Sequence, residues 1–268
     1  MDDIEVFKQV FPDKYFYEFW LKNKRPDGRE FTQLRKASIT RSGTAGFIIS
    51  SGNNVVQSTY EVQQAKVKIN TDARSSLEHL YEKITIQFAQ EASFPLFASY
   101  LNHLKKIIVN TYEQQLSALK LQEKIVIDIS ALFHDGSLLS PVMLSIMVAL
   151  YECFVNKCGV QAETLELLFP LVIKTFYIPE KDALLWLWDP SKEELTLDAS
   201  VLSGATYFAV MSLSTTKLSL EKIEGADMSL DDLANTAALF KDNLDRPAIR
   251  AALLNYLRDI TTPSHRLI

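Results

Sequence analysis

Glycine is scarce in this sequence, with eight residues among 268. Loops that cradle phosphate need several glycines near the start of a helix, because their backbone N–H groups must face the anion. No G-x-G-x-x-G or Walker pattern occurs, and the H-E-x-x-H, EF-hand and G-x-S-x-G motifs are also missing. The sequence therefore has none of these motifs for nucleotide binding, metal-dependent chemistry or serine-dependent hydrolysis.

Cysteine and histidine are few as well. Two cysteines, Cys153 and Cys158, lie five residues apart in a mainly apolar stretch. They are too few for a disulfide framework and do not have zinc-ligand spacing, so we predict buried thiols in a reducing compartment. None of the four histidines has the spacing of a metal-ligand pair. They are His79, His103, His134 and His265.

Positive charge is in deficit, with a net charge of −5. A self-sufficient nucleic-acid binder usually carries a basic excess, so any contact with RNA would use a local patch or basic partners. One stretch is locally basic through Lys22, Lys24, Arg25, Arg29, Arg35, Lys36 and Arg41. These side chains could contact RNA phosphates. The favoured alternative is that Arg25 and Arg29 hold a turn by bonding to Asp27 or to backbone carbonyls.

The N-terminus is acidic and has no basic region followed by an apolar run, so neither a secretory signal nor a mitochondrial presequence is predicted. The longest apolar run, residues 138–155, is interrupted by polar residues and is shorter than the roughly 20 residues of a spanning helix. We expect a buried core helix there, in a soluble intracellular protein without membrane contact.

Hydrophobic periodicity predicts an α+β or mixed α/β protein without regular βαβ alternation. Helices are expected at 4–24 with a break at Pro12, at 97–117, at 140–156 and at 229–259, the last with Ser229 and Asp232 as a capping box. Strands are expected at 37–40, 46–50, 55–62, 67–69, 84–88, 124–133, 171–178, 183–188, 207–211 and 219–224. The early strands are expected to form an antiparallel meander. We predict turns at 25–29, 52–54 and 134–137, and a single domain, 1–268.

Three acidic groups could carry chemistry. His134 beside Asp135 could form an acid–base pair, although a turn with a capping aspartate is favoured. Residues 189–194 contain three carboxylates that could bind Mg²⁺, but a solvated turn is favoured. The acidic residues of 227–232 sit at the start of a predicted helix, where carboxylates interact favourably with the helix dipole, and this structural role is favoured over chemistry.

The stretch Phe16–Arg29, followed by Arg35, resembles the RNase PH family. Four more pieces agree in order: 42–46 with 51–56 as a first hairpin, 125–137 as a strand ending in Asp-Gly, 169–194 as a hairpin ending in Asp-Pro-Ser-x-Glu-Glu, and the final helix. The resemblance spans nearly the whole chain. It implies an RNase PH-like α+β fold (ribosomal protein S5 domain 2-like), with mixed sheets, long packing helices and an N-terminal helical extension, 1–24.

Within that family the chain is most similar to subunits of the eukaryotic RNA exosome ring. The resemblance implies other RNase PH-like subunits in a hetero-hexameric ring, cap proteins and RNA in the assembled channel as partners. It also implies roles in rRNA maturation and mRNA turnover, in the nucleus, nucleolus and cytoplasm.

Departures from the family's pattern decide the expected mechanism. Active members place a phosphate-binding arginine where this chain has about Leu139, and a catalytic aspartate in the window that here reads Ser203-Gly204-Ala205-Thr206-Tyr207. Asp198 is too far back for an ungapped match, and the family's RNA-binding arginine is missing from 93–100. The stretch 63–96 also departs from the family, which leaves contacts there open. We therefore expect no catalytic residues, metal or cofactor, with RNA-binding residues unassigned. The alternative is an active exoribonuclease using His134, Asp135 and the 189–194 carboxylates with Mg²⁺.

Overall fold

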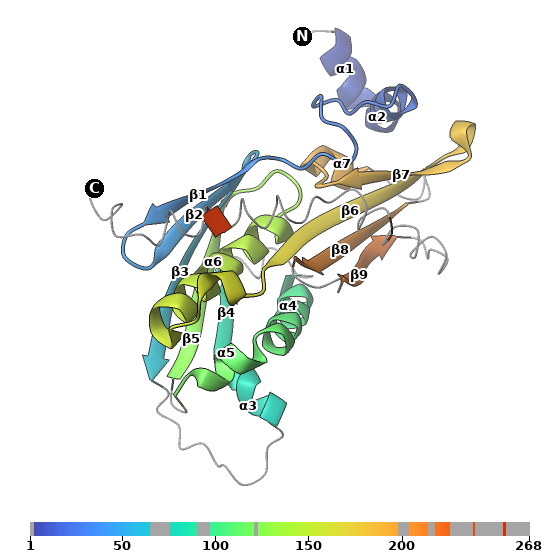
Figure 1. The fold of residues 1–268 in the computed structure, drawn as a ribbon. Coiled ribbons are helices and arrows are strands. Elements are labelled where there is room, and N and C mark those ends of the chain that lie inside the picture. Colours follow the sequence, from blue (N-terminus) through green and yellow to red (C-terminus); the bar gives the residue numbers. More distant parts are fainter. Residues whose placement is uncertain are drawn as a thin grey trace. The chain divides into compact units, whose positions relative to one another are not determined.

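The structure, a computed structural model, describes residues 3–64, 76–89, 97–120, 123–197, 204–213 and 218–225, together with residues 238, 254 and 255. Figure 1 labels the elements and colours them along the chain from the N-terminus to the C-terminus. They fall into two compact units, each assembled from separate stretches of chain. The first unit contains residues 1–36, 134–140 and 169–245, and the second contains 37–133, 141–168 and 246–268. The expectation of a single domain with an N-terminal helical extension stays a prediction.

The second unit is built on a five-stranded sheet in the order β1–β2–β3–β5–β4. The strands are β1 (Ala37–Ser42), β2 (Gly46–Ser51), β3 (Asn54–Gln64), β4 (Ile84–Phe88) and β5 (Glu123–Phe133). The hairpin turn predicted at 52–54 is present between β2 and β3, and a second hairpin joins β1 to β2. Gly43 and Gly52 supply the positive φ values of the two turns, 70° and 59°. The predicted meander is wrong at β4, which pairs parallel to β5 with Ile84 opposite Ile125. A parallel pair needs a crossover rather than a hairpin, and helices supply it here.

The helices described in this unit are α3 (Ser76–Glu82), α4 (Phe97–Thr111), α5 (Glu113–Ala118) and most of α6 (Leu139–Cys158), which is followed by a 3₁₀ turn, Ala162–Thr164. The single helix predicted over 97–117 is instead two helices that meet at Tyr112. The Tyr112 ring is fully buried 5.4 Å from that of Phe154, and its hydroxyl donates to the carbonyl of Glu166 at 2.7 Å. Tyr112 thus ties the α4–α5 junction to the α6 region.

The helix α6 is the predicted core helix. Within the part of the chain that the structure describes, it alone is long and apolar enough to cross a bilayer. Its most apolar 18-residue window is 78% buried inside the protein, which is the behaviour of a core helix. On its polar side, Glu152 is buried and accepts from Arg41 of β1 at 2.6 Å, so an ion pair ties this helix to the edge of the sheet.

The first unit contains a four-stranded sheet in the order β7–β6–β8–β9. Its strands are β6 (Leu168–Ile178), β7 (Ala183–Trp188), β8 (Ala205–Ser212) and β9 (Leu218–Gly225). Its described helices are α1 (Asp3–Val10), α2 (Pro12–Leu21) and α7 (Lys192–Thr196), with a 3₁₀ turn at Pro179–Lys181. The four predicted strands and the helix break at Pro12 are confirmed. The predicted strand 67–69 lies outside the described residues, as does nearly all of the helix 229–259 with its capping box.

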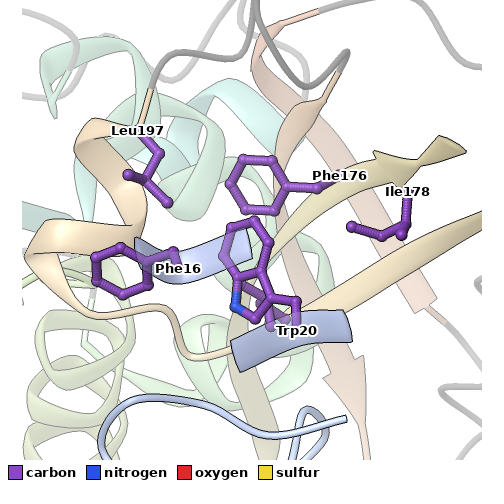
Figure 2. Packing of buried hydrophobic residues seen from close by; sticks show 6 residues of the cluster. Phe16, Trp20, Phe176, Ile178 and Leu197 are labelled. Atoms are coloured by element: carbon purple, nitrogen blue, oxygen red, sulfur yellow. The ribbon is translucent and has the colours of Figure 1, made fainter. Parts of the chain in front are cut away.

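Aromatic side chains attach α2 to the sheet of this unit. Figure 2 shows Phe16 and Trp20 of α2 against Phe176 and Ile178 of β6, with Leu197 beside them. The Trp20 and Phe176 rings lie 4.5 Å apart, and both side chains are fully buried. Full burial of such a side chain contributes about 1.5–3 kcal/mol, so this cluster fixes where the chain leaves α2.

Lysine side chains supply donors to the carbonyls at three helix ends. Lys174 donates to the carbonyls of Leu195 and Leu197 at 2.7 and 3.0 Å, at the end of α7. Lys83 donates to those of Leu116 and Leu119 at the end of α5. Lys181 donates to Trp20 near the end of α2. The last carbonyls of a helix have no intrahelical partner. The ammonium groups of Lys83 and Lys181 add to backbone amides that already bond to Leu116 and Trp20, and at the end of α7 Lys174 supplies the donor to two carbonyls.

Candidate functional site

The predicted turn Arg25-Pro26-Asp27-Gly28-Arg29 follows α2, which ends at Leu21 rather than at the predicted residue 24. The amide of Gly28 donates to the carbonyl of Arg25 at 3.0 Å, and Gly28 has a φ of +81° that suits glycine. The Asp27 carboxylate accepts from the Arg29 backbone amide at 3.1 Å and from its guanidinium at 2.7 Å. Burial would raise the pKa of the Asp27 carboxyl, but the bonds from Arg29 outweigh it and the pKa lies below its usual value.

Arg25 leaves this turn for the interior and is 1% exposed. Its guanidinium donates to both carboxylate oxygens of Glu194, with Nε 3.0 Å from Oε1, and to the carbonyl of Trp188 at 2.9 Å. Glu194, also 1% exposed, accepts in addition from the backbone amide of Ser191 at 2.8 Å. A buried pair of this kind is tolerated because both ions have their hydrogen bonds satisfied.

Asp189 receives Arg29 and Arg35. Its carboxylate accepts from Arg35 Nη2 at 2.6 Å and Nε at 2.9 Å, in a two-point contact. Arg29 Nη1 donates to the Asp189 carbonyl at 3.1 Å. Burial would lower the pKa of the Arg35 guanidinium. Its hydrogen bonds to Asp189 outweigh that effect and raise the pKa above its ordinary value, so the guanidinium stays charged. Asp189 itself is 5% exposed, so the pair lies largely away from water.

The same cluster holds the predicted turn at 134–137. Arg35 Nη1 donates to the carbonyl of Asp135 at 2.6 Å. Gly136 has a φ of +100°, and a Cβ built there would lie 2.5 Å from the carbonyl oxygen of Pro190. The two loops therefore touch backbone to backbone. Only glycine fits at that contact, which explains the Asp-Gly pair in this turn.

Three guanidinium groups and three carboxylates balance in this assembly, which we call the arginine cluster: Arg25, Arg29, Arg35, Asp27, Asp189 and Glu194. The structural interpretation of the arginines is confirmed, and their interpretation as phosphate contacts is wrong for Arg25, which has no exposed surface to offer. Lys22, Lys24 and Lys36 are exposed. They are the members of the basic stretch that remain open to an anionic partner.

The acidic segment 189–194 departs from its favoured interpretation. We predicted a solvated turn, yet Asp189 and Glu194 are buried against arginines about 160 residues earlier in the chain. One signal was available in the sequence. Ser191 and Glu194 have the S-x-x-E spacing of a capping box, and both of its hydrogen bonds are present at the start of α7.

The Mg²⁺-dependent alternative required the carboxylates of this segment to converge with His134 and Asp135. Instead, Asp189 and Glu194 face guanidinium groups, which would repel a cation. His134 is exposed, whereas the carbonyl of Asp135 bonds to Arg35. No group of three His, Cys, Asp or Glu residues suited to a metal occurs among the described residues. The geometry does not favour this alternative.

The positions that the resemblance made decisive for catalysis both lie in the first unit. Leu139, at the start of α6, is 7% exposed, and Thr206, on β8, is 7% exposed. Neither side chain carries a charge. Next to Thr206, the backbone of Ala205 is bonded to β6, because its amide donates to the Thr175 hydroxyl at 3.0 Å. Ser203, Asp198 and residues 93–96 lie outside the described part of the chain.

Comparison with known proteins places the fold. No protein-family model and no curated protein sequence matches the chain. Solved structures do match. An archaeal exosome core gives a TM-score of 0.56 at 16% identity, covering 96% of each chain. The Archaeoglobus fulgidus exosome with RNA bound to the active site gives 0.56 at 16% identity, covering 88% of this chain and 94% of that one. Rice (Oryza sativa) Rrp46 gives 0.51 at 17% identity, covering 87% and 98%.

At this level of identity the likeness shows the fold, and it covers nearly the full length of each matched chain. The predicted α+β, RNase PH-like fold is confirmed. What the matched proteins bind or assemble with belongs to them, and it enters the account of this chain only as a proposal.

Proposed function

We propose that this chain is a non-catalytic subunit of an RNA exosome ring that supports 3′–5′ RNA processing and degradation, including rRNA maturation and mRNA turnover. The observation that carries the proposal is the pairing of an exosome-core fold with uncharged, buried side chains at Leu139 and Thr206. Phosphorolysis needs a positioned cation for phosphate and a placed acid, and electrostatic stabilisation of this type is commonly the largest catalytic contribution. A chain that lacks both groups would contribute to the structure of the ring and not to catalysis.

The arginine cluster supports an architectural role. Its arginines are the charged part of the motif that resembles the family, and they are directed at carboxylates and carbonyls of their own chain. RNA would then be held by neighbouring subunits of a hetero-hexameric ring, with cap proteins attached. The net charge of −5 agrees with a subunit that does not bind RNA strongly alone.

The ring position that we propose is the one held by ribosomal RNA-processing protein 43, with the positions of proteins 42 and 45 as the close alternatives. The aromatic N-terminal helix running into Arg-Pro-Asp-Gly-Arg and the Asp-Pro-Ser-x-Glu-Glu turn support this choice. A subunit of this complex would be found in the nucleus, the nucleolus and the cytoplasm.

The direct test is affinity purification of the tagged chain from its own cells, followed by mass spectrometry. We expect five other RNase PH-like proteins and cap proteins in stoichiometric amounts. Their absence would refute the ring assignment. The purified chain is also expected to leave RNA 3′-ends intact in phosphate buffer, and robust release of nucleoside diphosphates would refute its non-catalytic status.

A further inference from the structure

The helix α1 presents its apolar side chains to solvent. Exposed fractions are 61% for Ile4, 42% for Val6, 40% for Phe7, 59% for Val10 and 48% for Phe11 at the following junction. Together they form an apolar strip, because residues spaced by three or four positions share one side of a helix. Most of the large hydrophobic side chains found exposed among the described residues belong to this strip.

The attachment of α1 to its own unit is polar. Lys8 lies at 2.7 Å from the Glu193 carboxylate of α7, and its ammonium sits 5.9 Å from the centre of the Tyr15 ring of α2. The bond to Glu193 raises the pKa of Lys8, so the ammonium is charged at neutral pH. The charged side chain of Lys8 therefore contacts α7 and α2, while the apolar side chains of the strip stay 40–61% exposed (Figure 1 shows α1 next to α2).

The strip is held in shape even though it is not buried. The Phe7 and Phe11 rings contact each other at 5.9 Å, and the amide of Phe11 donates to the carbonyl of Phe7 at 2.9 Å. The amide of Tyr15 donates to Phe11 in turn, which carries the backbone hydrogen bonding past Pro12 into α2. A presented and ordered apolar helix costs little further conformational entropy on binding, which favours a partner with a matching groove.

We propose that the apolar strip of α1 docks into an apolar groove on another protein of the exosome ring assembly, with a carboxylate on the rim of the groove facing Lys14 and basic groups facing Glu5 and Asp13. This inference rests on the proposed function. Charge sets the rim: the Lys14 ammonium lies 5.3 Å from the centre of the Phe11 ring, at the border of the strip, and the carboxylates of Glu5 and Asp13 also flank the strip. A carboxylate there would pair with Lys14 while the groove takes up Ile4, Phe7 and Phe11, which have the i, i+3, i+7 spacing of helix-in-groove recognition.

Size argues for a subunit of a larger assembly rather than a second copy of the chain. Stable interfaces bury about 800 Å² on each partner, more than five half-exposed side chains of a single two-turn helix can provide. The strip therefore fits as one anchor within a more extensive contact. A lipid surface is a poorer occupant, because Glu5 and Asp13 flank the strip and the chain carries a net charge of −5, which an anionic membrane repels.

The test uses the full chain in its purified complex. A photo-crosslinking amino acid replaces Val10, and in a matched control it replaces Gln9, which is exposed on the polar side of the same helix. After irradiation, mass spectrometry identifies the crosslinked protein. We expect position 10 to crosslink to one ring or cap protein about tenfold more than position 9. We also expect the double substitution Ile4→Asp, Val10→Asp to weaken retention of that protein about tenfold, as loss of interface anchors does.

The outcomes separate the two proposals. Recovery of RNase PH-like proteins with equal crosslinking at positions 9 and 10 would keep the ring assignment and overturn the docking proposal. Crosslinks to a second copy of the chain would overturn it as well. Absence of RNase PH-like proteins would refute the ring assignment by composition alone, and the named occupant with it. Because the strip lies outside the packed core, the double variant is expected to unfold at the same urea concentration as the unaltered chain, so lost binding cannot be ascribed to misfolding.

Discussion

Arg25 and Glu194 form a two-point ion pair at 0% and 1% side-chain exposure, across 169 residues of sequence. The neighbouring carboxylate of Glu193 pairs with Lys8 at 2.7 Å while 52% exposed. Two consecutive glutamates therefore make the same kind of contact in opposite environments. This arrangement allows the effect of burial on an ion pair to be measured within one helix.

The substitution Glu194→Gln is expected to destabilise the fold by about 3–5 kcal/mol, because it removes the two-point charge partner of the buried Arg25 guanidinium and leaves it with the partly exposed Asp27, 3.8 Å away. Glu193→Gln is the matched control and should cost less than about 1 kcal/mol, since exposed pairs are weak. Urea unfolding followed by tryptophan fluorescence measures both. Equal losses of stability would show that burial of the first pair has no energetic weight.

Replacing Gly136 by alanine should be more damaging than the same change at Gly28. Both have positive φ, +100° and +81°, so each alanine carries a backbone penalty of about 1–2 kcal/mol. At Gly136 the new Cβ would also meet the Pro190 carbonyl oxygen at 2.5 Å, whereas at Gly28 nothing lies within 4 Å. We expect Gly136→Ala to cost a further 1–3 kcal/mol or so through overpacking. Thermal unfolding of the two variants side by side would decide, and a smaller loss at Gly136 would contradict the close contact of the loops.

The lysines at the helix ends predict that removing a buried ammonium costs more stability than removing an exposed one. Lys174 is 2% exposed, so Lys174→Met removes the donor to two carbonyls that water reaches poorly. A loss of about 2–4 kcal/mol is expected, since each buried unsatisfied group costs about 1–3 kcal/mol. Lys181 is exposed, and Lys181→Met should cost less than about 1 kcal/mol because water can replace it. Urea midpoints in the reverse order would count against the capping role.

Burial raises the pKa of the Cys153 thiol to about 12. Near pH 8 only about one thiol in ten thousand would then be thiolate, the reactive form. In a Cys158→Ser variant, we expect a disulfide reagent to modify Cys153 only after unfolding in guanidinium chloride. The raised pKa also makes stability depend on pH: the contribution is complete below the ordinary thiol value near 9 and is lost as pH rises toward 12. Rapid modification of the folded variant would show that this thiol is accessible.

Element type was predictable along most of the chain because periodicity reports which side of a segment is buried. The strands of both sheets and the core helix α6 follow from it. The direction in which neighbouring strands pair was harder to predict from the sequence. The alternation within 84–88 is the same for a parallel and an antiparallel strand, so nothing local showed that β4 runs parallel to β5. The break at Tyr112 was missed because an aromatic residue on the apolar side of a helix reads as continuation.

The candidate site divides in the same way. The turn at 25–29 and its internal Arg29–Asp27 bond are local features, and the sequence predicts them. The burial of Asp189 and Glu194 depends on arginines that the fold brings from the other end of the chain. The composition near residue 190 predicts a solvated turn, and only the tertiary contacts show that its carboxylates are buried. The Ser191 capping box was the one local sign that this turn is ordered.

The discontinuous first unit has a consequence for biosynthesis. Its N-terminal 36 residues contribute Trp20 and Arg25, whose buried partners lie in the last hundred residues. A ribosome adding about 5–20 residues per second needs roughly 8–34 s to cover the 169 residues between Arg25 and Glu194. During that interval an aromatic helix and an unpaired guanidinium are exposed on the nascent chain. Because these buried contacts join the beginning of the unit to its end, we expect the unit to complete its folding late, with its first 36 residues open to chaperones until then.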